Sequence, residues 1–342
     1  METTNIALIG CGFFAANHLH AWNGLAPEAR IVAVCDLDAE KAKAAADTFG
    51  VPAWYTDATA MLDAEAIDLV DIATQMRSHR PLAELTLGRG VATIVQKPFA
   101  PTLADAVAIR DAASGTFCAV HENFRFQPVM RRIAEVLAAG EIGPTTWARI
   151  AFRTGYDVYA TQPYFYEEER FAILDVGIHV LDLVRVFMGE VDHLSCEAQR
   201  RNPRVRAEDT ATMLIRHVSG AVSVVEHTYE SRREPDPFPD TRILIEGNRG
   251  AIAYDANDVL EITVDGSVRR ETVAPPLAPW MEERWRIAHL SVPATCAHIL
   301  ERFRAGKPAD TSADDNLKTF ALVEAAYRSA ASGRAEKPPE TD

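Results

Sequence analysis

The chain has 342 residues, 48% of them hydrophobic and 25% charged, and a formal net charge of −14 at pH 7. This length suggests two domains, and the composition is that of a globular protein rather than a disordered or collagenous chain. The negative charge would repel phosphate backbones and anionic membrane surfaces, so we expect no nucleic acid or membrane partner and favour a neutral small molecule.

Cysteine usage indicates the compartment. The chain has five cysteines, an odd number, widely spaced and without a CxxC pair, so we expect neither a disulfide framework nor a metal site. The first residues show no basic segment before an apolar run, and no apolar run of about 18 residues occurs. We therefore expect a cytoplasmic protein. The cysteines are Cys11, Cys35, Cys118, Cys196 and Cys296.

Residues 1–120 alternate short β-rich runs with helical stretches, the pattern of a parallel sheet with helices on both faces. Two helices have clear starts, because Asp38 should cap a helix over 39–49 and Thr102 one over 103–114. The series predicts an α/β fold, an N-terminal Rossmann domain with a doubly wound parallel sheet. Its six strands are expected at 5–9, 31–35, 53–55, 69–73, 91–95 and 117–120.

After residue 120 the sequence predicts a different architecture. A helical stretch over 128–140 precedes two strand pairs joined by turn signals, over 211–229 and 242–255. These hairpins predict a C-terminal α+β domain over 121–310, with an open, mainly antiparallel sheet, which we expect to bind the substrate. A last helix within 311–333 should pack back on the core, and the tail after it should fray.

A glycine-rich turn follows the first expected strand. Gly10 and Gly12 stand where the strand ends and the next helix begins, with Ala15 at the place of the third glycine in GxGxxG. Gly10 would make the tight turn and Gly12 would let a pyrophosphate approach the backbone, while the third position needs only a small residue. The motif alone can be a structural turn, but its place in a βαβ series predicts a dinucleotide site.

Asp36, at the end of the second expected strand, indicates which dinucleotide binds. Its carboxylate can accept hydrogen bonds from a ribose 2′-hydroxyl and would repel a 2′-phosphate, which favours NAD over NADP. The alternative is that Asp36 only helps to start a helix, although Asp38 is the better cap. The expected cofactor-binding residues are Gly10, Gly12, Phe13, Phe14, Asp36, Thr74, His79, Gln96, Lys97 and Asn123.

Ligands in open α/β sheets bind beyond the carboxyl ends of the strands, and polar residues follow three of them here. Thr74 and His79 come after the fourth strand, Lys97 after the fifth, and His121 and Asn123 after the sixth. A Lys-Pro pair in isolation is usually a solvated turn. At this edge, however, Lys97 becomes a candidate group for assisting the ionisation of a substrate hydroxyl.

A second set of candidates lies on the helical stretch "LDVGIHVLDLVRVFMG". Asp175 and His179 are one helical turn apart and share a face. Asp182, one turn further, could instead be a structural partner of a core histidine. Gly177 between them favours a functional interpretation, since a glycine inside a helix costs roughly 1 kcal/mol relative to alanine and suggests that another backbone or a ligand approaches closely.

Four segments, "GCGFFA", "QKP", "DVGIHVLD" and the closing "GKPADTSADDNLKTFALVEAAYRSAASG", resemble the Gfo/Idh/MocA oxidoreductases over essentially the whole chain. The lysine of the family's E-K-P motif matches Lys97, with Gln96 in place of the usual glutamate. The Asp and His of the D-x-G-x-H motif match Asp175 and His179. The usual Thr-Pro after the fourth strand is Thr74-Gln75 here, which leaves the shape of that loop open.

The resemblance implies hydride transfer between NAD(P) and a sugar or cyclitol hydroxyl, in a cleft that the antiparallel sheet covers on one side. It also implies a homodimer or homotetramer through that sheet, and a cis peptide bond between Lys97 and Pro98. Histidine has the ordinary pKa nearest neutrality, so we assign His179 as the base. Lys97 would stabilise the developing alkoxide and Asp175 would orient the hydroxyl. An exchange of roles between Lys97 and His179 stays open.

The segment "RTGYDVYATQPYFYEEER" offers rings and hydrogen-bonding groups suited to a polyhydroxylated ligand, although a subunit contact would use the same residue types. "QKPFAP", "HENFRFQP" and "QPYF" are similar to the branch of the family that includes apiose dehydrogenases, which implies an aldose oxidised at its anomeric carbon. The alternatives are an inositol or polyol dehydrogenase, a glycosidase that retains NAD, and a non-catalytic NAD-responsive binding protein. The expected substrate-binding residues are Lys97, His121, Asn123, Arg153, Tyr156, Gln162, Tyr164, Asp175 and His179.

Overall fold

The structure, a computed structural model, describes residues 3–234, 236, 238–255 and 258–341. The chain divides into two compact units: residues 1–123 with 287–317, and residues 124–286 with 318–342. The sequence places residues 287–310 in the second domain, whereas in the structure they belong to the first unit. The apolar side of their helix packs into the core of that unit, where Val292, Cys296 and Ile299 join one cluster with Ile6 and Leu19.

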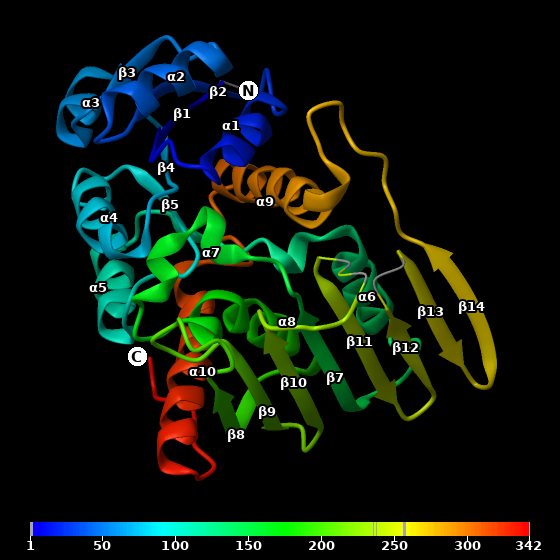
Figure 1. The fold of residues 1–342 in the computed structure, drawn as a ribbon. Coiled ribbons are helices and arrows are strands. Elements are labelled where there is room, and N and C mark those ends of the chain that lie inside the picture. Colours follow the sequence, from blue (N-terminus) through cyan, green and yellow to red (C-terminus); the bar gives the residue numbers. More distant parts are fainter. Residues whose placement is uncertain (1–2, 235, 237, 256–257, 342) are drawn as a thin grey trace. The chain divides into compact units, whose positions relative to one another are not determined.

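The first unit is built on the expected parallel sheet. Its strand order is β3-β2-β1-β4-β5-β6, with every pair parallel (Figure 1). The order reverses at β1 and β4, which is where doubly wound folds bind ligands. The strands are β1 (Thr4–Ile9), β2 (Ala29–Cys35), β3 (Ala53–Tyr55), β4 (Leu69–Ile72), β5 (Ala92–Gln96) and β6 (Cys118–His121).

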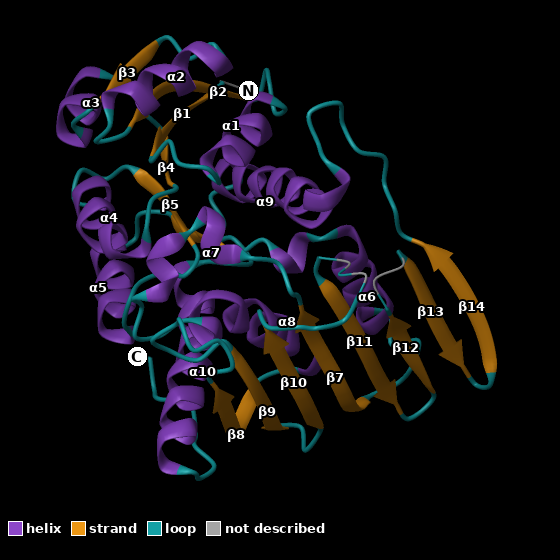
Figure 2. Ribbon diagram, in the orientation of Figure 1, coloured by secondary structure: helices purple, strands orange, loops and turns teal. Residues whose placement is uncertain are grey.

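Both predicted helix caps of the first unit are confirmed. The Asp38 carboxylate accepts hydrogen bonds from the backbone N–H groups of Glu40 and Lys41, and the Thr102 hydroxyl accepts one from that of Asp105. The helices are α1 (Ala15–Asn23), α2 (Ala39–Phe49), α3 (Ala58–Ala64), α4 (His79–Leu87), α5 (Leu103–Ala113) and α9 (Arg286–Arg304), and a short 3-10 turn, η1 (Met76–Ser78), precedes α4 (Figure 2).

The second unit contains an eight-stranded sheet in the order β14-β13-β12-β11-β7-β10-β9-β8. The two predicted hairpins are present as β9–β10 and β11–β12, and the sheet is mainly antiparallel. One pair differs, because β7 lies between the hairpins and pairs in parallel with β10. The strands are β7 (Thr145–Arg153), β8 (Val191–Gln199), β9 (Thr210–His217), β10 (Val222–Thr228), β11 (Asp240–Gly247), β12 (Gly250–Tyr254), β13 (Val259–Val264) and β14 (Ser267–Thr272).

Helix α8 packs on β7 and β10 at the centre of this sheet. A π-helical turn, η4 (Ile173–Gly177), precedes it without a break. The remaining elements are η2 (Phe124–Phe126), α6 (Pro128–Ala138), α7 (Val158–Thr161), η3 (Pro163–Tyr166), α8 (Ile178–Met188), η5 (Glu283–Trp285) and α10 (Ala313–Ser332). None of the helices in the described part of the chain is long and apolar enough to cross a membrane.

The expectation of a frayed tail is wrong for the residues after α10. Glu336 pairs with Leu194 of β8 through two backbone hydrogen bonds, of 2.8 and 2.9 Å between nitrogen and oxygen. Ser329 of α10 also accepts a hydrogen bond from the backbone nitrogen of Cys196 in β8. The tail therefore continues as a partner of the edge strand.

Candidate functional site

The glycine-rich turn has the geometry that a dinucleotide requires. Gly10 has a φ of +97°, and a Cβ added there would lie 2.7 Å from Cγ2 of Thr74, so only glycine fits. At Gly12 no atom of the described residues lies within 4 Å of an added Cβ. No described side chain caps the start of α1, where the backbone N–H groups of Ala15 and Asn17 donate to the carbonyl oxygens of Gly12 and Phe14. These features fit a pyrophosphate.

Asp36 is bound to this turn. Its Oδ2 accepts a hydrogen bond of 2.7 Å from the backbone nitrogen of Cys11, and its Oδ1 accepts one of 2.9 Å from that of Asp38. A carboxylate has about four acceptor positions, so both oxygens can still receive ribose hydroxyls. Phe13 is 63% exposed beside the turn, while the ring of Phe14 packs edge-on against His18.

His79 does not fit its expected role as a cofactor-binding residue. Its side chain is completely buried, with Nδ1 3.0 Å from the carbonyl oxygen of Pro98 and Nε2 3.0 Å from that of Thr74. Burial lowers the pKa of His79. His79 therefore links the loop after β4 to the loop after β5. Of the two residues expected after the fourth strand, Thr74 and His79, Thr74 is the better candidate for a cofactor contact, because it packs against Gly10.

Lys97 follows β5 and is half-buried. The Lys97–Pro98 peptide bond is cis, as the sequence resemblance implies. The side chain of Gln96 accepts a hydrogen bond of 2.7 Å from the backbone nitrogen of Lys97, and its Nε2 lies 3.1 Å from Nε2 of the buried His18. The side chain of Gln96 thus binds the backbone of Lys97, its neighbour in the Gln-Lys-Pro motif.

His121 and Asn123 are both buried. The ring of His121 lies 4.2 Å from that of His18, and its Nε2 lies 3.7 Å from Sγ of Cys296. Asn123 donates to the hydroxyl of Ser291 over 2.6 Å. His121 is therefore an interior residue of the first unit, and its expected contact with substrate is not supported.

The side chains of His18, His121 and Cys296 bring their ligand atoms within 4.8 Å of one another, a spacing that a metal ion could use. The contacts favour a hydrogen-bonded cluster instead. Nε2 of His18 already contacts the amide of Gln96, and burial raises the pKa of the Cys296 thiol well above its ordinary value, which keeps it protonated.

In the second unit, the Asp175 carboxylate lies in the π-helical turn η4. Tyr229 donates its hydroxyl to Oδ2 of Asp175 over 2.6 Å, and its ring stacks on that of Phe171. Burial, together with the neighbouring carboxylate, raises the pKa of Tyr229 well above its ordinary value, so the hydroxyl remains a donor. Single π-helical turns occur frequently at functional sites.

Gly177 is required by a side chain that the sequence did not indicate. A Cβ on Gly177 would lie 2.7 Å from Cε1 of His227 in β10. The expected close approach is therefore real, and it is made mainly by a histidine ring, with the backbone oxygen of Ala172 3.2 Å from the added Cβ. His227 is fully buried, and no described residue hydrogen-bonds either of its ring nitrogens. Burial lowers its pKa to about 3.

His179 is held by an aromatic stack. Its ring lies parallel to that of Phe124, with centroids 3.8 Å apart and planes at 4°. The adjacent Arg125 donates to Asp182 over 2.7 Å, and Thr319 of α10 donates to the same carboxylate over 3.0 Å. The Asp182 carboxylate thus holds the turn that carries Phe124 through its hydrogen bond from Arg125.

Two of the expected sugar-binding residues lie together near Asp175. Tyr164 donates its hydroxyl to Oε1 of Gln162 over 2.6 Å. Burial and the charge of Asp175 both raise the pKa of Tyr164. Tyr156 is placed differently, in a ring cluster with Phe238 and Trp285 at centroid distances of 4.7 and 5.4 Å.

The structure does not bring Arg153 to these residues. Side chains alternate between the faces of a strand, and Phe152, which packs near Phe124, occupies the face of β7 toward α8. Arg153 is on the opposite face and forms an ion pair of 3.0 Å with Glu226, so its expected contact with substrate is not supported. Arg149 shares that carboxylate.

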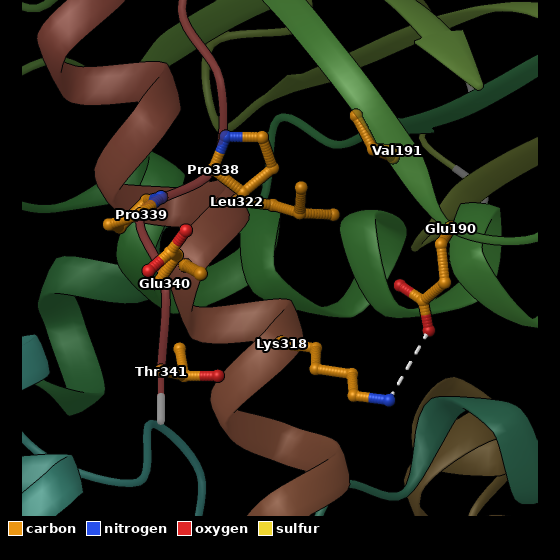
Figure 3. A pocket seen from close by; sticks show the side chains of 9 residues that line it. Glu190, Val191, Lys318, Leu322, Pro338, Pro339, Glu340 and Thr341 are labelled. Atoms are coloured by element: carbon orange, nitrogen blue, oxygen red, sulfur yellow. Dashed lines mark ion pairs between the residues drawn. The ribbon is translucent and has the colours of Figure 1, made fainter. Parts of the chain in front are cut away.

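A separate cavity of about 230 Å³ lies between α10 and the C-terminal tail, as Figure 3 shows. Lys318 there lies 3.8 Å from Glu190, and Pro338 and Pro339 lie beside Leu322. The residues that line this cavity include none of the expected site residues, so it gives no support to a substrate site.

The comparisons with known proteins cover both units. A model described as an oxidoreductase family with an NAD-binding Rossmann fold matches residues 4–124, and the GFO/IDH/MocA C-terminal domain matches residues 130–253. The D-apiose dehydrogenase of Paraburkholderia graminis is 46% identical over 96% of this chain and 88% of its own. That of Rhizobium rhizogenes is 43% identical over 96% and 95%.

Solved structures agree with the fold. A crystal structure of an oxidoreductase from Agrobacterium radiobacter, in complex with NAD+, L-tartaric acid and magnesium, has 42% identity and a TM-score of 0.95 over 98% of each chain. A levoglucosan dehydrogenase in complex with NADH has a TM-score of 0.86 over 99% of this chain and 100% of its own, at 21% identity, and is similar in fold alone.

Proposed function

The chain belongs to the GFO/IDH/MocA family of NAD-binding oxidoreductases, and on that premise we propose that it oxidises a monosaccharide, D-apiose or a close relative, at the anomeric carbon. The observation that carries this proposal is the 43–46% identity to D-apiose dehydrogenases over 96% of the chain, which has Lys97, Asp175 and His179 at the family's motif positions. Bound NAD supplies the hydride acceptor for such a reaction.

The cofactor site we propose is centred on Gly10, Gly12 and Asp36. Gly10 makes the tight turn beside Thr74, and Gly12 leaves space for the pyrophosphate. The carboxylate of Asp36 accepts the ribose hydroxyls and favours NAD over NADP. His79 is left out, because its burial between two carbonyl groups is inconsistent with direct contact with the cofactor. We retain the other expected cofactor-binding residues of the first unit. These are Phe13, Phe14, Thr74, Gln96, Lys97 and Asn123.

For the chemistry, we propose that His179 accepts the proton of the substrate hydroxyl and that Lys97 stabilises the negative charge that develops on its oxygen. Asp175 orients the hydroxyl. The stacked Phe124 supports the orientation of the His179 ring, and the hydrogen bond from Tyr229 supports that of the Asp175 carboxylate.

Gln162, Tyr164 and Tyr156 are the proposed contacts to the other hydroxyls of the sugar. The first two offer an amide and a phenol within the region influenced by Asp175. Since a polyhydroxylated ligand needs several donors and acceptors on an otherwise apolar surface, these side chains fit the substrate class better than a wholly apolar lining would.

We further propose a cytoplasmic homodimer or homotetramer. The five cysteines are free thiols, in keeping with a reducing compartment. For the subunit contact we propose the face of the second sheet that points away from α8, which carries Leu214 with 57% of its side chain exposed, beside Arg149 and Glu226. Measuring the mass in solution for the wild type and for Leu214→Glu tests this contact.

The function is tested by incubating the protein with NAD and a panel of aldoses, polyols and glycosides. NADH absorbance and glycoside cleavage are followed in the same samples. NADH formed with aldoses, and D-apiose best among them, supports the proposal. NADH formed only with inositols or other polyols would identify a polyol dehydrogenase, cleavage without net NADH a glycosidase, and binding without turnover a non-catalytic protein.

A further inference from the structure

We propose that Gln96 is a positioning residue for Lys97, which it holds through a buried chain of hydrogen bonds that ends on Asp71. The proposal rests on the role proposed above for Lys97. Gln96, His18 and Asp71 come from β5, α1 and β4 of the first unit, so three elements of its sheet and helices meet behind the candidate lysine.

The chain of contacts is continuous. Oε1 of Gln96 accepts the backbone N–H of Lys97 at 2.7 Å, and Nε2 of Gln96 lies 3.1 Å from Nε2 of His18. Nδ1 of His18 lies 2.8 Å from Oδ2 of Asp71, which also accepts the indole N–H of Trp22 at 2.8 Å. His18, Asp71 and Trp22 are completely buried and Gln96 nearly so, which makes the chain rigid and dry.

The direction of each hydrogen bond follows from its neighbours. The backbone N–H of Lys97 can only donate, so it requires the oxygen of the Gln96 amide. The amide NH₂ therefore faces His18 and donates to a ring nitrogen without a proton. The other ring nitrogen then carries the proton and donates it to Asp71. One orientation of the glutamine and one neutral tautomer of the histidine satisfy all of these contacts, while Oδ1 of Asp71 has no hydrogen-bond partner among the described residues.

Among the described residues, none other than Asp71 is a strong proton acceptor for the ring of His18. The titratable groups that face it are Asp71 from β4 and His121 from β6, with Cys296 of α9 beyond His121. Burial alone would raise the pKa of Asp71, but the charge that His18 carries when protonated lowers it instead, together with the hydrogen bond from His18, the charge of His121 and the hydrogen bond from Trp22. The chain thus ends on an ionised carboxylate that needs the proton of His18.

A glutamine at position 96 makes this support independent of pH, since an amide does not ionise. A glutamate would face His18 as an acceptor, and the chain could be restored only if His18 bound a second proton. Asp71, His18 and residue 96 would then have the same total charge as in the natural protein. The backbone at Lys97 would be held only while that proton stayed bound.

The test compares two variants. Gln96→Met removes both hydrogen bonds with a side chain of similar size, and Gln96→Glu keeps both only while His18 carries a second proton. Thr93→Val is the matched control, because Thr93 is buried in the same strand and bonds to Thr86 at 2.8 Å, remote from the motif. We expect Gln96→Met to lower kcat roughly 10- to 100-fold, the effect of a misplaced group, while Thr93→Val stays near the wild type.

The pH profile distinguishes positioning from a general loss of stability. Gln96→Glu should turn over nearly as the wild type while His18 holds the second proton, and lose activity once rising pH removes that proton, in a step that the wild type lacks. Profiles of Gln96→Glu and wild type that coincide at every pH would overturn the proposal. So would one equivalent of zinc in the purified protein that is lost in His18→Asn, since a metal would displace the Gln96 amide.

A double-mutant cycle with Lys97→Met shows whether Gln96 acts through the lysine. Gln96→Met should have little further effect on the residual kcat of Lys97→Met, and an equal effect in both backgrounds would contradict positioning. Failure of the proposed function gives a different result, because the wild type would then form no NADH with aldoses, and failure of the role proposed for Lys97 would leave Lys97→Met with normal turnover. In that case the pH dependence of unfolding for Gln96→Glu still reports whether His18 binds the second proton.

Discussion

Tyr229 donates its hydroxyl to Oδ2 of Asp175 over 2.6 Å, joining residues 54 positions apart in the sequence. This bond ties the π-helical turn that carries the candidate carboxylate to the residue after β10. Its length and the ionised acceptor place it among the stronger hydrogen bonds in proteins, about 1.5–3 kcal/mol. The orientation of Asp175 therefore depends on a tyrosine outside the motif.

Replacing Tyr229 by phenylalanine tests this dependence. Loss of a bond of this strength should lower kcat/KM roughly 10- to 100-fold, because Asp175 would orient the substrate hydroxyl less well. The melting temperature should fall by only a few degrees, since the hydrogen bond is lost but the ring can still stack on Phe171 at 5.2 Å. Tyr159→Phe is the matched control, because the Tyr159 hydroxyl contacts Glu230 at 3.5 Å and the side chain of Asn202 instead of Asp175. Equal kinetics for the two variants would show that Tyr229 does not position Asp175.

The buried His227 predicts how stability depends on pH. Its pKa is lowered to about 3 by burial, from an ordinary value of 6.5. Between these values the unfolded chain binds a proton at this residue and the folded chain does not. Its neutral form is therefore compatible with folding above pH 6.5, and stability is lost as the pH falls from 6.5 toward 3, by up to about 1.4 kcal/mol per pH unit.

Urea unfolding at several pH values between 7 and 4.5 measures this slope. His227→Leu should give a flatter curve than the wild type, because leucine has no proton to bind. His193→Gln, with 42% of its side chain exposed on β8, is the control and should keep the wild-type slope. If the wild-type and His227→Leu curves run parallel, His227 does not contribute as proposed.

The fold could be predicted from sequence to the extent that its signals are local. The caps Asp38 and Thr102 act on N–H groups two or three residues away, and the glycine-rich turn is read from three neighbouring positions. The parallel pairing of β7 with β10 depends on contacts about 75 residues apart, which no local pattern encodes. The same holds for α9, which returns to the core of the first unit.

The candidate site could be predicted only where a motif marked it. His227 lies on β10 and Tyr229 directly after it, and the alternation of a strand predicts that a side chain is buried, but not which helix it meets. Arg153 was expected near the substrate because its type is suitable, whereas the pleat of β7 turns it to the opposite face. His121 illustrates a third reason, since a polar residue after a strand can equally be buried in a hydrogen-bonded cluster.

Cofactor preference tests the role of Asp36. We expect the wild type to have a higher kcat/KM with NAD than with NADP, since the carboxylate repels a 2′-phosphate. Asp36→Ala should narrow this ratio. Asp36→Asn is the informative partner variant, because its amide oxygen can still accept the backbone N–H of Cys11 while the charge is gone. A wild type that uses NADP with the lower KM would refute the assignment.

The roles of His179 and Lys97 can be separated by pH–rate profiles. His179→Ala should lower kcat by the roughly 10²- to 10⁴-fold typical of a lost general base, with little change in affinity for NAD, and should lose the acidic limb of the profile. Lys97→Ala should be comparably impaired but keep that limb. If His179→Ala keeps both turnover and the limb while Lys97→Ala loses both, the lysine is the base.

The most direct test of the central claim follows the hydride itself. The protein is incubated with NAD and D-apiose that carries deuterium at the anomeric carbon, and the mass of the NADH formed is measured. We predict NADH one mass unit heavier than that formed from unlabelled sugar, together with a slower rate, because the C–D bond at that carbon is the one broken. Unlabelled NADH would show that another carbon is oxidised, and the absence of NADH with D-apiose and every other aldose tested would contradict the proposed function.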